Sequence, residues 1–247
     1  MSASLDTTPQ EKSREAARTR RRGFLYPAIY AVGILLGSLV FSILAEWAGL
    51  TFLWSAQGVH HSETMLATEI GYLDRDFRRR LLHSSPAELA QRVSRRVQDT
   101  LLIKTGFSDA RRRWLLPVSP TESTAWSLFK RAYRVLDTYF LAAANIAGVF
   151  SVRLLVIALS LPMFALIGIA ALVDGLVQRD LRRFGGGREY GRLFHTVRRY
   201  NSPLIMLTAF VYLSIPVSLH PNWLFVPAAL LFGLTLFITA ATFTKYF

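Results

Sequence analysis

The sequence predicts an all-α, polytopic membrane protein with about four transmembrane helices and a helical extracytoplasmic subdomain between the first and the second. Three observations predict this class. Apolar residues, 52% of the 247, are concentrated in long uncharged blocks, which is typical of membrane spans. Arginine-rich segments separate several of these blocks, and their charge indicates which side of the membrane they face. The remaining polar region has apolar residues at spacings of three and four, which favours helices over strands.

The composition limits the chemistry that this chain can perform. It contains no cysteine, which excludes disulfides, thiolate zinc sites, iron–sulfur clusters and cysteine catalysis. The formal net charge of +13 is compatible with nucleic-acid binding, with anionic lipid or with the positive-inside bias of membrane proteins. The positions of the arginines must therefore decide between these interpretations.

The N-terminal part predicts a cytoplasmic tail followed by a membrane anchor. Residues 1–23 are polar and carry six basic and three acidic side chains, a net +3, and we expect a disordered basic tail. Residues 24–45 hold no charge, and 22 helical residues are about 33 Å long, enough to cross a membrane. A signal peptide is the alternative, but the apolar stretch is long for one and ends without a small-residue cleavage site. Gly33 and Gly37 form a GxxxG pair, a candidate helix-packing motif that chance would explain equally well.

Residues 46–153 are the large polar region, which we expect to form about three periplasmic helices. Two Ser-Pro-x-Glu capping boxes, at 85–88 and 119–122, predict helix starts. The helix opened at Ser85 should end near Gly106. An apolar stripe predicts an earlier helix, and its members are Leu66, Ile70, Leu73, Phe77 and Leu81.

The next apolar block contains one charge, Arg153, between residues 138 and 173. Thirty-six helical residues would measure about 54 Å, too long for one span, and no Pro or Gly pair near Arg153 supplies a turn. We therefore expect one helix that runs from the polar region into a second span at 154–173, with Pro162 as a potential kink. Arg153 would lie at the interface with its head group in water, and residues 139–152 would pack on neighbours or lie in the interface.

The C-terminal part predicts a helical hairpin. Residues 174–202 form an Arg-rich loop whose seven arginines minus three acidic residues give +4. Residues 203–219 and 223–243 are the third and fourth spans, with a turn at His220, and 244–247 end the chain. The positive-inside rule places the tail, the 174–202 loop and the 244–247 end in the cytoplasm, and the long 46–153 region outside.

The sequence holds no recognisable catalytic or metal-binding pattern. His60 and His61 are adjacent, so on a helix they point about 100° apart, and with Glu63 they indicate a polar patch rather than a metal site. The glycines at 185–187 lack the lysine and the preceding strand of a phosphate-binding loop and are simpler to interpret as a helix end. We expect no enzyme activity, catalytic residue, metal or cofactor, and no small-molecule substrate is evident.

The arginines of the 174–202 segment are the candidate contact residues for a partner or for anionic lipid. DNA is the alternative, but the aromatic residues between them are irregularly placed, so direct nucleic-acid contact is not expected. The candidates are Arg179, Arg182, Arg183, Arg188, Arg192, Arg198 and Arg199.

The chain resembles the membrane proteins of integrating conjugative elements, a family whose domain has no assigned function. The resemblance covers roughly residues 45–247. It rests on HSETMLATEIGYLDRDF (61–77), LVDGLVQRDLRRFGGGRE (172–189) and YLSIPVSLHPN (212–222). It implies a multi-pass protein of the bacterial inner membrane, encoded with a DNA transfer system similar to type IV secretion, and it supplies no active site.

Two hypotheses about function follow. The first is a non-enzymatic scaffold or adaptor of a conjugative apparatus, with membrane lipids and other conjugation subunits, such as the coupling ATPase, as partners. The alternative is a membrane-embedded protein that binds lipid or transports a small molecule, although the spans show no carboxylate or lysine of the kind that marks ion pathways. An enzyme ranks third.

Overall fold

The computed structural model describes residues 9–76, 86–114, 124–185 and 191–243, and these ranges contain helices and no strand. This confirms the all-helical fold class. The elements in chain order are α1 (Pro9–Phe52), α2 (His60–Asp76), α3 (Pro86–Asp99), the short π-helix η1 (Thr100–Lys104), α4 (Phe107–Trp114), α5 (Thr124–Phe184), α6 (Gly191–Ser214) and α7 (Pro221–Ala241).

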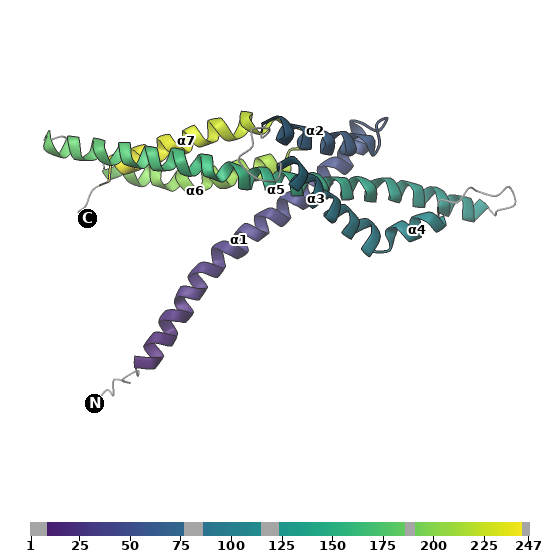
Figure 1. Cartoon of the computed structure of the whole chain (residues 1–247). Helices are drawn as coiled ribbons and strands as arrows, with labels where there is room; N and C mark the ends of the chain where they lie inside the picture. The colour runs from purple at the N-terminus through teal and green to yellow at the C-terminus, as the bar shows by residue number, and fades with distance from the viewer. Residues whose placement is uncertain (1–8, 77–85, 115–123, 186–190, 244–247) are drawn as a thin grey trace.

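Helix α5 is the axis of the molecule. Its 61 residues are about 90 Å long at 1.5 Å per residue. In Figure 1, α6 and α7 lie along its C-terminal half, and α3 and α4 lie along its N-terminal half. One continuous helix therefore runs from the polar region into the apolar block, as predicted. Residues between 139 and 152 pack on neighbouring helices, since Ile146 and Val149 are buried against Met65 of α2.

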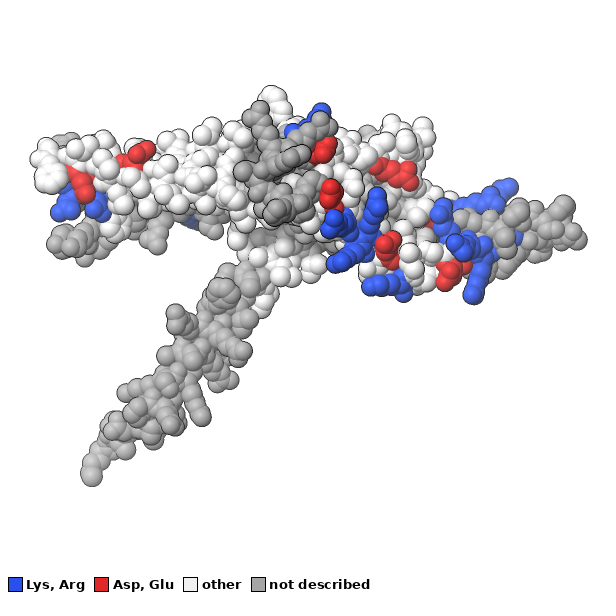
Figure 2. Space-filling view, in the orientation of Figure 1, with Lys and Arg blue, Asp and Glu red and all other residues white. Residues whose placement is uncertain are grey.

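Three helical stretches are long and apolar enough to cross a membrane: Ile29–Phe52, Phe129–Phe184 and Pro221–Ala241. A helical membrane protein is therefore plausible. The predicted span at 203–219 corresponds to a shorter apolar helix, Pro203–Ser214. The helix stops early because Pro216 cannot continue it and disfavours a helical conformation at residue 215. In Figure 2 most basic side chains lie between the central junction and the N-terminal end of α5, a few lie at its C-terminal end, and a mostly uncharged stretch separates the two groups.

Two segments predicted as irregular are helical. Residues 9–23, expected to be disordered, belong to α1. They contain five Arg, two Ala and two Glu, which favour helices, and they extend a helix that the span has already nucleated. The Arg-rich 174–202 segment is also mostly helical, because α5 continues to Phe184 and α6 begins at Gly191. The predicted end of the second polar helix near Gly106 is confirmed, because α3 and η1 together end at Lys104. Gly106 has a φ of +75°, which glycine adopts readily and which a helix cannot contain.

Helices α5 and α7 pack closely through glycines. A Cβ on Gly175 would lie 2.7 Å from the Ala240 Cβ and 2.7 Å from the Phe237 carbonyl oxygen. A Cβ on Gly233 would lie 2.6 Å from the Ile167 side chain. Backbones can approach at these positions only because the glycines carry no side chain.

Helix α1 leaves the bundle at an angle (Figure 1). The side that faces the bundle includes a row of buried polar residues, Ser38, Ser42 and Glu46, at spacings of four, beside the apolar residues Ile43 and Leu50. Its exposed side is apolar and includes the positions of the GxxxG pair, around which the described residues place nothing within 4 Å of a Cβ at Gly33 or Gly37. The predicted motif therefore packs on none of the described helices, and its role in pairing with another helix stays a prediction.

Candidate functional site: a buried charge cluster at the helix junction

The most unusual cluster in the described chain is a set of polar side chains that are almost completely buried. Arg153 of α5 is 1% exposed, Glu69 of α2 is 0% exposed and Tyr212 of α6 is 1% exposed. Three helices that are far apart in the sequence supply them, so the cluster lies where the polar helices meet the apolar bundle. Burying such groups is costly unless each one is hydrogen-bonded.

The carboxylate of Glu69 accepts hydrogen bonds from both partners. Arg153 Nε and Nη2 donate to Glu69 Oε1 at 3.0 and 2.7 Å. The hydroxyl of Tyr212 donates to Glu69 Oε2 at 3.2 Å. Burial raises the pKa of the Glu69 carboxyl above its ordinary value, and the neighbouring charge of Arg153 opposes that rise.

The remaining donors of Arg153 bind one backbone carbonyl in the last turn of α6 and two in the segment that follows it. Arg153 Nη1 donates to the carbonyl oxygens of Tyr212 at 3.0 Å and Ile215 at 2.6 Å, and Nη2 donates to that of Val217 at 2.8 Å. The last carbonyls of a helix have no partner within the helix and carry a partial negative charge. Arg153 therefore caps α6 and pairs with α2 at once.

These five bonds use all five N–H donors of a guanidinium. No donor of Arg153 remains for a ligand, so the cluster fixes three segments relative to each other. The prediction that the head group of Arg153 reaches water is wrong. The reason is that α2 and the 215–217 segment cover it and replace water as hydrogen-bond partners.

Two smaller polar contacts join the other helices to the same junction. Glu46 at the end of α1 is hydrogen-bonded to His61 of α2 at 3.1 Å, and the Trp54 ring stacks on the His61 ring with centroids 4.0 Å apart. The predicted histidine patch is thus half-buried at His61 and holds α1 against α2. Among the described residues, no group of three or more His, Asp or Glu side chains could hold a metal ion.

The second contact is a chain of three side chains. Gln98 of α3 donates to Asn145 of α5 at 3.0 Å, and Asn145 donates to Ser62 of α2 at 3.1 Å. Gly148 allows α3 to approach α5 here, since a Cβ would lie 2.8 Å from the Ser94 hydroxyl. Helices α2 and α3 are therefore attached to α5 by specific polar bonds as well as by apolar packing.

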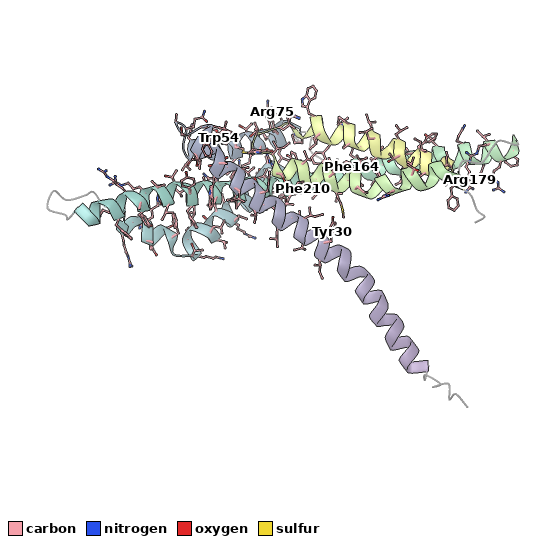
Figure 3. All side chains as sticks on the ribbon, turned by 180° about the vertical axis from the view of Figure 1, so that it is seen from behind. Tyr30, Trp54, Arg75, Phe164, Arg179 and Phe210 are labelled. Carbon is pink, nitrogen blue, oxygen red and sulfur yellow. The ribbon has the colours of Figure 1, made fainter. Side chains whose placement is uncertain are left out.

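The predicted contact arginines fall into different environments. Arg182 donates to the carbonyl oxygen of Ala241 and so caps α7. Arg179 pairs with Asp180 at 2.9 Å and lies over the Phe243 ring, at the end of the bundle far from Trp54 (Figure 3). Arg183 and Arg199 are exposed. The side chains of three further candidates, Arg188, Arg192 and Arg198, lie outside the described residues.

The sequence indicated only part of this cluster. Arg153 was visible as the single charge in a long apolar block, whereas Glu69 and Tyr212 belong to ordinary helical patterns. No spacing relates these residues, because they lie 84 and 59 positions from Arg153 along the chain. The signal in the sequence was Arg153 itself, because a buried arginine needs an acidic partner. The acidic residues of the polar helices were the candidates for that partner.

Comparison with known proteins supplies the family. Neither curated proteins nor solved structures give a match to this chain. A protein-family model described as "IncC plasmid conjugative DNA transfer protein DtrJ-like" matches residues 53–244, which is more than half of the chain and includes the whole charge cluster. This confirms the predicted link to conjugation, and the chain belongs to the DtrJ-like family of conjugative DNA transfer proteins.

Proposed function

We propose that this protein is a non-enzymatic membrane scaffold or adaptor of a conjugative DNA transfer apparatus. The observation that carries the proposal is the Arg153 cluster, which joins polar helices to apolar ones by a fully hydrogen-bonded charge. A protein that only anchors itself in lipid has no need of such a junction. A protein that transmits position or force from a docking surface to the membrane does need it.

The helices attached to the N-terminal half of α5 supply the docking surface in this proposal. Their basic side chains are exposed and visible in Figure 2. Exposed arginines suit a docking surface because interfaces between proteins are often enriched in arginine. The exposed arginines are Arg92, Arg95 and Arg96 on α3, Arg111, Arg112 and Arg113 on α4, and Arg131 and Arg134 on α5. The expected partners are other membrane subunits of the apparatus, such as the coupling ATPase, and not DNA directly.

We further propose four spans in the bacterial inner membrane, with both termini in the cytoplasm and the α2–α4 helices in the periplasm. The absence of native cysteine allows a direct test with single cysteines at two exposed positions, Gln91 of α3 and Gly185 after α5. In intact cells, an impermeant maleimide should label Gln91→Cys and leave Gly185→Cys unlabelled. The reverse pattern would contradict this orientation.

The function is tested by transfer frequency from a donor that lacks only this chain. We expect transfer to be lost on deletion and restored by a plasmid copy. A plasmid copy with Arg153→Met should fail to restore transfer, while Arg131→Met, an exposed change on the same helix, should restore it. Membrane levels of both variants must be measured alongside. Normal transfer from the deletion donor would contradict the proposal that this protein is a scaffold of the apparatus.

Stable association distinguishes a scaffold from the lipid-binding or transport alternative. A scaffold should co-purify with other membrane subunits in mild detergent, and reversing the charges of Arg112 and Arg113 should weaken that association. Arg111 is kept unchanged, because it pairs with the nearly buried Asp137 at 3.1 Å. Purification as a single polypeptide under conditions that keep the rest of the apparatus together would favour the alternative.

A further inference from the structure

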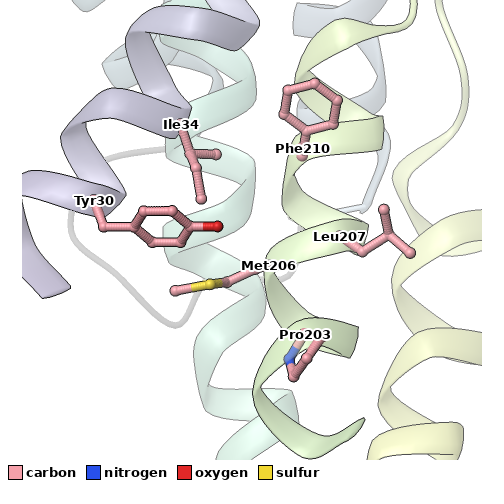
Figure 4. Close-up of a pocket in the computed structure, with 6 residues that line it drawn as sticks. All are labelled: Tyr30, Ile34, Pro203, Met206, Leu207 and Phe210. Carbon is pink, nitrogen blue, oxygen red and sulfur yellow. The ribbon is translucent and has the colours of Figure 1, made fainter.

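Helices α1 and α6 enclose an apolar groove with a volume of about 470 Å³. Figure 4 shows its six lining residues, two from α1 and four from α6. They are Tyr30, Ile34, Pro203, Met206, Leu207 and Phe210. The groove is open on one side, since Tyr30 is 62% and Leu207 is 60% exposed. Both helices contribute apolar stretches, so in a membrane this opening faces lipid.

One end of the groove contains polar atoms that a ligand could bind. The Tyr30 side chain reaches from α1 towards α6 across the groove (Figure 4), and its hydroxyl has no hydrogen bond to any described residue. Pro203 has no N–H, so the carbonyl oxygen of Arg199 has no donor four residues later in α6. Polar groups next to hydrocarbon are stabilised by a hydrogen-bond partner, and a ligand with a polar end would supply one to the Tyr30 hydroxyl.

The same end carries positive charge. Arg199 is exposed and precedes Pro203 by four residues, so both lie on one face of α6. Leu207 and Phe210 continue that face along the groove. The spacing therefore places a basic residue one helical turn beyond the lining residue Pro203, where it suits the phosphate of a lipid whose acyl chain lies in the groove.

The shape of the groove suits a lipid chain. It is lined by apolar side chains and is open on one side, so a single flexible hydrocarbon chain can lie along it between α1 and α6.

We propose that this groove binds an anionic phospholipid, with an acyl chain between α1 and α6 and the phosphate at Arg199 and the Tyr30 hydroxyl. The bound lipid would fill the gap between the oblique α1 and the bundle and would hold α1 in place. This inference requires that α1 and α6 lie in the membrane, but it does not depend on the adaptor role.

The experiment measures lipid that remains on the full-length protein after purification in mild detergent, by native mass spectrometry. Leu207→Trp places a large ring in the groove and, because Leu207 is exposed, leaves the core intact. Leu230→Trp on α7 is the control, since Leu230 is equally exposed at 61% but lies outside the groove. We expect Leu207→Trp to lose the bound phospholipid and Leu230→Trp to retain it.

A second variant tests the charge. After delipidation, wild-type protein should rebind phosphatidylglycerol in preference to phosphatidylcholine, and Arg199→Gln should reduce that preference about fivefold. Equal retention of phospholipid by the Leu207→Trp and Leu230→Trp variants would overturn the proposal, as would equal rebinding of both lipids by the wild type.

A photo-crosslinking amino acid at position 207 covers the case in which Leu207→Trp is poorly expressed. It should give an adduct with the mass of a phospholipid, and the same crosslinker at 230 should give little. An adduct with a polypeptide at position 207 would contradict the lipid assignment.

Discussion

Helix α5 is held by two interfaces with opposite chemistry. Against α7 it packs through small residues, with Gly175 and Gly233 at the closest approaches. Against α2 and the end of α6 it is held by a buried charge whose donors are all used. One interface depends on the absence of side chains and the other on a single long side chain.

The difference follows from the surroundings of each interface. Between helices in lipid there is no hydrophobic driving force, so close van der Waals packing provides the attraction. This packing holds only while Gly175 and Gly233 lie at the closest approaches, because a larger side chain there would clash. A guanidinium that must satisfy five bonds also tolerates little shift, because each displaced bond leaves a buried group unpaired. Both interfaces therefore restrict the register of α5, one through the space available and the other through polar bonds.

The largest predicted effect comes from removing the charge at the junction. Arg153→Met should destabilise the folded protein by about 3–5 kcal/mol, because Glu69 stays buried without its partner. The measurement is the apparent melting temperature in detergent, compared with Arg131→Met on the exposed face of α5. Adding Glu69→Leu to Arg153→Met should recover part of the loss. If Arg153→Met and Arg131→Met have the same melting temperature, the cluster does not stabilise the junction.

The next effect is that of the tyrosine in the same cluster. Tyr212→Phe removes the bond from the hydroxyl to Glu69 Oε2 and keeps the ring, so it should cost about 1.5–3 kcal/mol for a bond to a charged group. Tyr139→Phe is the matched control, because its hydroxyl bonds only to Thr51 at an exposed site. Thermal melts of both variants give the comparison. A larger loss for Tyr139→Phe would indicate that Glu69 is satisfied without Tyr212.

The glycine interface should respond to added volume. Gly175→Leu must displace the Ala240 side chain or the α7 backbone, with an expected cost of about 1–3 kcal/mol. Gly37→Leu, where the described chain offers open space, should leave the melting temperature of the isolated protein unchanged. If Gly37→Leu instead disrupts an oligomer seen by size-exclusion chromatography, the GxxxG pair packs against another chain.

The sequence predicted the continuous helix α5 and the helical class because both depend on local patterns of apolar residues. It missed the partners of Arg153 because Glu69 lies in an amphipathic helix whose polar face looks solvated. It also missed that Arg182 caps α7, since that contact links two helices 59 residues apart. Periodicity identifies elements and their faces, but the pairing of polar groups across elements depends on how the helices are packed.

The smallest effect separates two arginines that are adjacent in the sequence. Arg182 donates to the carbonyl of Ala241, at the negative end of the α7 dipole, whereas Arg183 is exposed. Arg182→Gln should therefore cost about 0.3–1 kcal/mol and speed amide hydrogen exchange at the end of α7, while Arg183→Gln should change neither. Binding to vesicles that contain phosphatidylglycerol should show the opposite ranking, with the larger loss for Arg183→Gln. Equal effects of the two variants in both measurements would mean that the cap adds nothing to the general attraction between basic side chains and anionic lipid.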